Sequence, residues 1–129
     1  MLRVITGFHT IVYSEDAEAT RVFFRDVLSW HHIDAHDGWL IFRTPPSELG
    51  VHPAVGDGGE VWAGVPRHEV SLMCDDLDAA LSELRAKGVR VLREPQDQGW
   101  GLAAAIEVPA AGEMMLYQPH YQPPFDTAR

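Results

Sequence analysis

The chain has 129 residues, 46% of them hydrophobic and 22% charged, which suits one domain with a buried core and is too short for two. Ten basic and 19 acidic residues give a formal net charge of −9, so neither nucleic acid nor a membrane surface is expected as a partner. The apolar runs are too short to span a membrane, and the first residues show no signal-peptide pattern. The single cysteine, Cys74, excludes an intrachain disulfide and favours a cytoplasmic location.

The first part of the chain shows a βαβββ pattern. Residues 4–13 are rich in β-branched side chains and predict a strand. Asp16 then begins a helix with an apolar stripe that ends near Leu28. Strands are predicted at 31–36, 39–44 and 48–52, and Asp37-Gly38 is typical of a hairpin turn between the first two of them.

The same order of elements returns in the second part. Residues 53–66 are rich in Gly and Pro and are interpreted as a linker. A strand at 69–74, a helix beginning at Asp76 and ending at Gly88, and strands at 89–93, 100–108 and 113–118 follow. The expected organisation is therefore one domain with half-repeats at 1–52 and 67–119, a linker at 53–66 and a tail at 120–129.

An offset of sixty residues relates the two halves. Asp16 falls on Asp76 and His9 falls on Glu69, although few residues are identical at this offset. One half cannot cover both faces of a four-stranded sheet, whereas two paired halves can. We therefore expect an α+β fold in which two βαβββ half-repeats pair around a cleft.

Several segments resemble one known family. HTIVYSEDAEATRVFFRDVL is similar to its first strand and helix, CDDLDAALSELRAKGV to the second pair, and Trp100-Gly101 and PAAGEMMLYQP to its closing strands. This family is the vicinal oxygen chelate superfamily, which contains glyoxalases, bleomycin-resistance proteins and extradiol dioxygenases. The resemblance covers nearly the whole chain and implies a glyoxalase-like fold.

The resemblance also implies a divalent metal, one of Zn, Mn, Fe, Ni or Mg, that polarises adjacent oxygens of a substrate. The positions that hold the metal in the family correspond here to His9, His52 and Glu69, with Glu48 as a further candidate beside His52. Each has a structural alternative: a hydrogen-bonded core residue for His9, a solvated charge for Glu69 and an ordinary strand end for His52.

The last strand departs from the family pattern. Met115 stands where the family usually has a glutamate, and a thioether is a poor ligand for these metals. Glu113, two residues away on the same strand face, is the candidate catalytic carboxylate, acting as a general base. Alternation along 69–74 turns Val70, Leu72 and Cys74 toward the helix and leaves Glu69, Ser71 and Met73 for the cleft.

Two functions remain open from the sequence. One is a metal-dependent lyase or dioxygenase acting on a substrate with adjacent oxygens. The other is a metal-free protein that sequesters an antibiotic-like small molecule, aromatic or cationic, in a cleft whose walls include Tyr13, Met73, Trp100 and Met115. Apolar side chains outside the predicted core also predict a homodimer; they are Trp62, Tyr121 and Phe125.

Overall fold

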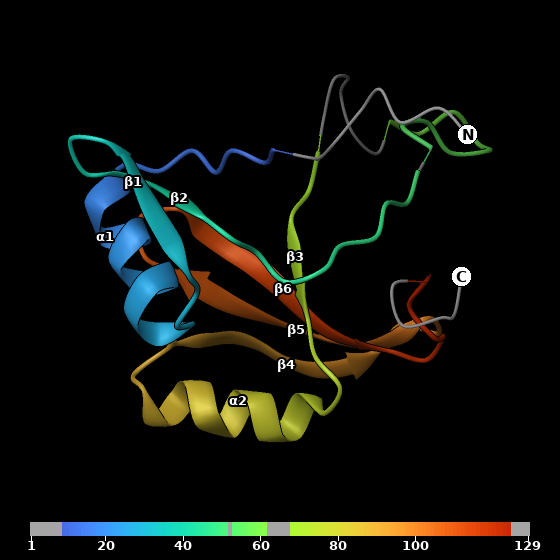
Figure 1. The fold of residues 1–129 in the computed structure, drawn as a ribbon. Helices are drawn as coiled ribbons and strands as arrows, with labels where there is room; N and C mark the ends of the chain where they lie inside the picture. Colours follow the sequence, from blue (N-terminus) through green and yellow to red (C-terminus); the bar gives the residue numbers. More distant parts are fainter. Residues whose placement is uncertain (1–8, 52, 62–67, 125–129) are drawn as a thin grey trace.

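The computed structural model describes residues 9–51, 53–61 and 68–124, and its elements follow the predicted order closely. Two helical segments and a hairpin come first, and a complete βαβββ unit follows (Figure 1). The elements are α1 (Ala17–Val22), the π-helix η1 (Phe23–Val27), β1 (His32–His36), β2 (Trp39–Phe42), β3 (Ser71–Met73), α2 (Leu77–Ala86), β4 (Val91–Asp97), β5 (Gly101–Val108) and β6 (Gly112–Pro119).

The second half forms a four-stranded sheet in the order β3-β6-β5-β4. β3 runs parallel to β6, and the other neighbours are antiparallel. Helix α2 lies along one face of this sheet (Figure 1), where its buried Leu77, Leu81 and Leu84 recur at helical spacing. The predicted α+β class and the βαβββ order are confirmed here.

The first half is only partly regular. The β1–β2 hairpin turns at Asp37-Gly38, where φ values of 44° and 87° match the predicted turn. Residues 9–13 and 48–51, predicted as parts of two strands, are irregular, and residues 1–8 and 52 lie outside the described chain. The period of a segment predicts a strand, but a strand also needs a partner backbone. Within the described part of one chain, neither segment pairs with another strand.

The two helix starts confirm the sixty-residue repeat. The Asp16 carboxylate accepts a hydrogen bond from the backbone N–H of Ala19 at 3.1 Å. The Asp76 carboxylate accepts one from Ala79 N–H, also at 3.1 Å. Each aspartate is therefore an N-cap of the same kind, at equivalent positions of the two halves.

Both halves share one hydrophobic core on the α2 side of the sheet. Its buried members are Phe23, Phe24, Leu77, Leu81, Leu84, Ala104, Ile106, Val108, Met114 and Leu116. Phe24 stacks on Trp30 with ring centroids 5.1 Å apart and meets Phe42 edge-on at 5.6 Å, so the hairpin is tied to the same core. Since the helices of both halves occupy this face, no helix of the described residues covers the opposite face of the sheet.

Polar contacts fix the first half against the second. The Thr20 hydroxyl donates to the carbonyl of Pro109 at 2.7 Å, in the turn between β5 and β6. The Lys87 ammonium donates to the carbonyl of Val27 at 3.1 Å, at the end of η1.

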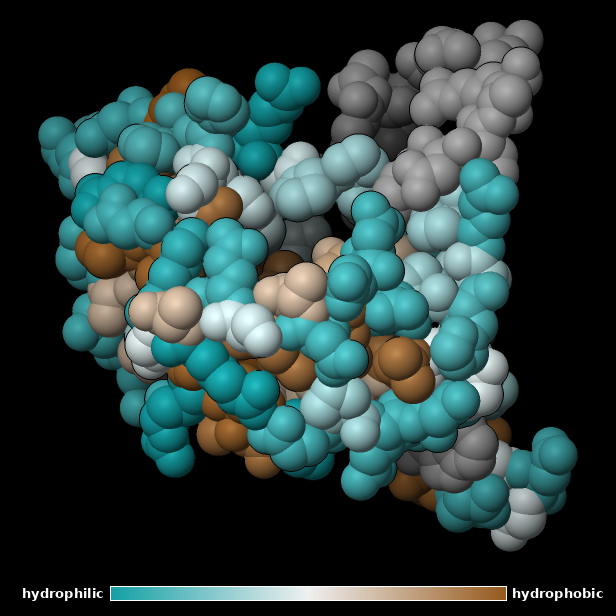
Figure 2. Space-filling view, turned by 90° about the horizontal axis from the view of Figure 1, so that it is seen from below, coloured by the Kyte–Doolittle hydropathy of each residue, from teal (hydrophilic) through white to brown (hydrophobic). Residues whose placement is uncertain are grey.

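Seen from the α2 side, the surface is mostly hydrophilic with separate hydrophobic patches (Figure 2). No helix within the described residues is long and apolar enough to cross a membrane.

Candidate functional site

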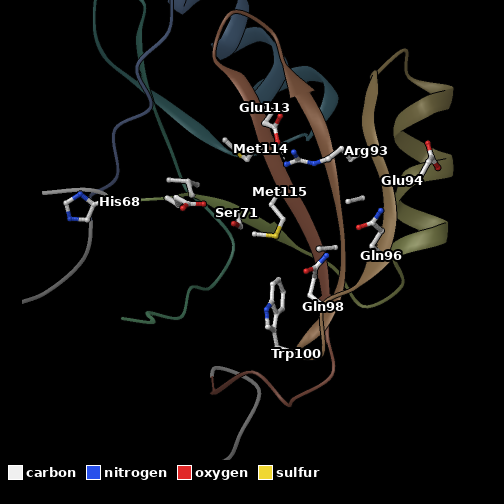
Figure 3. A pocket seen from close by; sticks show the side chains of 14 residues that line it. His68, Ser71, Arg93, Glu94, Gln96, Gln98, Trp100, Glu113, Met114 and Met115 are labelled. Carbon is white, nitrogen blue, oxygen red and sulfur yellow. Dashed lines mark hydrogen bonds and ion pairs between the residues drawn. The ribbon is translucent and has the colours of Figure 1, made fainter. Parts of the chain in front are cut away.

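A hollow of about 720 Å³ lies on the face of the sheet opposite the core. All of its lining residues belong to the second half, between positions 68 and 115. They come from the approach to β3 and from β3, β4, β5 and β6 (Figure 3). The uncovered sheet face therefore carries a hollow that is open to a ligand.

The floor of the hollow is set by strand alternation. Ser71 on β3 is paired with Met115 on β6, and both line the hollow. Their neighbours Leu72 and Leu116, one residue along each strand, pack against the core on the other side. The Met115 side chain points into the hollow (Figure 3). A polarizable, flexible thioether thus occupies the centre of the floor.

One end of the hollow is charged. The guanidinium of Arg93 on β4 donates to the carboxylate of Glu113 on β6, across the sheet (Figure 3). The two side chains are 69% and 45% exposed, so the pair is in contact with water. The neighbouring Glu94 pairs instead with Arg85 of α2. Glu113, the predicted catalytic carboxylate, therefore lines the hollow but is engaged by a fixed positive charge.

The other end is closed by Trp100, which is 44% exposed. Its loop is held in shape by Asp97, whose carboxylate accepts from Gly99 N–H at 2.8 Å and lies 3.2 Å from His120 Nε2. These two partners hold the pKa of Asp97 below its ordinary value, the Gly99 N–H contributing most. The backbone N–H of His120 also donates to the carbonyl of Trp100 at 2.8 Å. The indole wall is thus positioned by a small polar network.

Beside Trp100 lies a group that we call the Glu48 cluster, consisting of Glu48, Tyr117 and Tyr121. The phenol of Tyr121 donates to Glu48 Oε2 at 2.5 Å, and that of Tyr117 lies 3.4 Å from the same oxygen. The two phenol oxygens are 2.9 Å apart. The Tyr117 ring meets the Trp100 ring at 90° with centroids 5.2 Å apart.

Burial shapes the electrostatics of the Glu48 cluster. It raises the pKa of both phenols, and hydrogen bonding to Glu48 raises that of Tyr121 further. Both phenols are therefore neutral hydrogen-bond donors near neutral pH. The second carboxylate oxygen, Glu48 Oε1, is buried and has no hydrogen-bond partner among the described residues.

Sequence reasoning did not find this cluster. From the sequence, Glu48 is a candidate metal ligand and Tyr121 is part of a predicted dimer contact, and nothing joins the two. The signal that was present is alternation along β6, which turns Tyr117 to the same face as Met115.

The predicted metal ligands do not form a site within the described residues. Glu69 lines the hollow, whereas the exposed His9 is not among the residues that line it. His52 lies outside the described residues, so its role stays a prediction. No three His, Cys, Asp or Glu side chains of the described chain lie close enough together to hold a metal ion. With Glu113 paired to Arg93 and His52 outside the described residues, the described part of the chain brings no complete set of metal ligands together.

The remaining predicted cleft residues are placed differently from one another. Trp100 and Met115 both line the hollow. Met73 is paired with Tyr117, so it faces the same side of the sheet farther along. Tyr13 is 88% exposed and borders a second hollow of about 600 Å³, beside the turn between β5 and β6.

Comparison with known proteins agrees with this fold. The family model described as Glyoxalase/Bleomycin resistance protein/Dioxygenase superfamily matches residues 8–114. TnmS3, an antibiotic binding protein from Streptomyces sp. CB03234, is 22% identical with a TM-score of 0.62, covering 92% of this chain and 99% of that one. Lactoylglutathione lyase from Agrobacterium tumefaciens is 15% identical with a TM-score of 0.59, covering 90% and 96%. No curated protein sequence matches the chain.

Proposed function

Because this chain belongs to the glyoxalase/bleomycin resistance protein/dioxygenase superfamily, we propose that its hollow binds a small molecule, namely a planar aromatic, antibiotic-like compound that it sequesters without a metal. The observation that carries the proposal is the composition of the hollow. Its floor is the thioether of Met115 and its end wall is the indole of Trp100, while Glu113, one of the three glutamates that line it, pairs with Arg93.

The size and chemistry of the hollow support such a ligand. Small-molecule sites commonly enclose about 300–1,000 Å³ and combine apolar walls with a few placed polar groups. The hollow has 720 Å³, and Ser71, Gln96 and Gln98 provide polar groups around Met115 and Trp100. A flat ring on the thioether and against the indole gains contact over a large area. The same fold carries a binding role in TnmS3, which is described as an antibiotic binding protein.

Calorimetric titration with planar polycyclic compounds tests the proposal. Trp100→Leu is expected to weaken binding by about 5- to 10-fold, the contribution of one aromatic contact. Trp39→Phe is the matched control, because Trp39 is 56% exposed on the first-half hairpin and contacts Arg21 instead. No binding across the panel, or equal loss in the two variants, would contradict the proposal.

A metal-dependent lyase or dioxygenase is the second candidate. Glu69, which lines the hollow, falls on His9 at the sixty-residue offset that the two N-caps support. Together with His52 they would be the ligands of Zn, Mn, Fe, Ni or Mg. Elemental analysis of the untagged protein separates the candidates, since one metal ion per chain that His9→Ala removes would replace the binding proposal by the enzymatic one.

We also propose that the functional unit is a homodimer. Ile11, Leu49 and Val51 are 56%, 76% and 94% exposed in one chain, although the sequence predicts strands at their positions. A second copy that pairs with these segments would bury them and face the open hollow. Light scattering coupled to gel filtration should give twice the chain mass, and Val51→Glu should shift the protein toward monomer. A wild-type monomer at high concentration would refute this.

A further inference from the structure

We propose that the Glu48 cluster is a subsite for a cationic nitrogen group, an ammonium or amidinium carried by the aromatic ligand of the hollow. The inference rests on the proposed function and deepens it, because it specifies the charge of the ligand and the place where that charge is held. Three observations carry it: the state of the carboxylate, the surrounding rings and the position of the cluster beside the hollow.

Only one of the two oxygens of the Glu48 carboxylate accepts hydrogen bonds from described residues. Its Oε2 has phenol donors at 2.5 Å and 3.4 Å, whereas its Oε1 is buried without a donor. A buried acceptor without a partner is costly, so such groups are rare unless a ligand or ion supplies the donor. A cationic N–H is the strongest donor available to a carboxylate. Within the described chain, Glu48 forms no ion pair with a Lys, Arg or His side chain.

The rings around Glu48 suit a cation. Tyr117 and Trp100 stand perpendicular, with centroids 5.2 Å apart, and so form an aromatic corner beside the carboxylate. The face of an indole or phenol ring attracts a cation within about 6 Å. The two phenols are neutral and direct hydrogen bonds toward Glu48, which orients the carboxylate. A carboxylate bordered by aromatic faces recognises an organic cation better than a strongly hydrated metal ion.

Trp100 connects the subsite to the hollow, because it lines the hollow and also contacts Tyr117. A planar ring system over Met115 and against Trp100 therefore directs a substituent toward Glu48. Tyr121, which donates to the carboxylate, is 40% exposed and follows the end of β6. Its side chain must turn outward to admit the cation, and in doing so exchanges its hydrogen bond to Glu48 for water.

Two dyes with the same ring skeleton test the subsite. 9-Aminoacridine is a planar cation at pH 7, and acridone is its neutral counterpart. In calorimetric titrations, Glu48→Gln should weaken 9-aminoacridine binding by about 10-fold or more, the contribution of a charge-assisted hydrogen bond, and should change acridone binding by less than about two-fold. Glu83→Gln removes the same charge on the exposed side of α2 and should change neither affinity by more than about two-fold.

The outcomes separate the subsite from the proposed function. If both dyes bind and Glu48→Gln affects them equally or not at all, the subsite is wrong and the hollow stands. If neither dye binds the wild-type protein, the proposed aromatic site fails and the subsite fails with it. Tyr121→Phe provides a second variant that keeps the charge; it should retain or strengthen 9-aminoacridine binding, and a loss as large as that of Glu48→Gln would also overturn the proposal.

Discussion

Replacing Gly101 by alanine should damage the end of the sheet that carries Trp100. A Cβ at position 101 would lie 2.6 Å from the backbone oxygen of Gln118 and 3.1 Å from the Cα of Pro119. Ordinary carbon–oxygen contacts need about 3.3 Å or more, so β5 and β6 would have to separate locally by about 0.7 Å. Neither neighbour is a flexible side-chain end, so the strands themselves must move.

The expected cost follows from this overlap. Forcing a methyl group into a closely packed place commonly costs about 1–3 kcal/mol, and Gly101 is paired with Pro119 at the very end of the β5–β6 ladder. We expect the free energy of unfolding of Gly101→Ala to fall by about 2 kcal/mol. Because residue 101 adjoins Trp100, binding of acridone should weaken as well.

Urea denaturation followed by circular dichroism measures the loss of stability. Gly50→Ala is the matched control, since its added Cβ meets no atom within 4 Å. The control should lie within about 0.5 kcal/mol of wild type, as surface substitutions usually do. If Gly101→Ala is equally neutral, the close approach of β5 to the end of β6 is refuted, and with it the stated position of Trp100.

Three further results are expected. Asp16→Ala and Asp76→Ala should each lower the free energy of unfolding by about 1 kcal/mol in urea melts, and a loss at only one would contradict their equivalence as N-caps. Ile106→Ala, at a fully buried position, should cost about 3 kcal/mol in the same assay, and a cost below about 1 kcal/mol would refute its place in the core. Burial and the neighbouring Asp75 raise the pKa of Cys74 to about 11, so the thiol should react with Ellman's reagent at pH 8 on the order of 100-fold more slowly than a free cysteine, and faster as pH rises toward 11. Rapid labelling at pH 8 would show that the thiol is not buried as described.

The second half of the fold could be predicted from the sequence because the residue patterns that indicate its elements are local. The leucine spacing of α2, the aspartate before it and Gly88 after it all lie within a few residues of one another. Gly88 adopts a φ of 86°, as a glycine that ends a helix commonly does. The Asp37-Gly38 turn was predictable for the same reason. Such features depend on neighbouring residues, so no knowledge of distant contacts is required.

The first half was less predictable because its strands depend on partners. Residues 48–51 alternate like a strand, yet Leu49 and Val51 remain exposed in a single chain. Periodicity indicates that a segment can pair, but it does not identify the backbone that pairs with it. The proposed second copy would supply that backbone.

The candidate site could be anticipated from the sequence only as separate residues. Met115 was placed in a cleft by its match to the family's last strand and Trp100 by its place before the closing strands; both border the hollow, and their role in binding stays a prediction. The Glu48 cluster joins residues 69 and 73 positions apart. Hydrogen bonds over such separations leave no trace in local periodicity, so only the folded chain brings Glu48 to the two phenols.

Methyl NMR on methionine-labelled protein tests the central claim, ligand binding at the uncovered sheet face, most directly. The Met115 side chain points into the hollow, whereas Met114, its neighbour on β6, borders the hollow but is 8% exposed and belongs to the core. With the Met115 resonance assigned through Met115→Leu, titration with acridone should shift that resonance progressively to saturation and leave that of Met114 much less affected. An unshifted Met115 resonance at dye concentrations where calorimetry detects binding would place the ligand elsewhere and contradict the account.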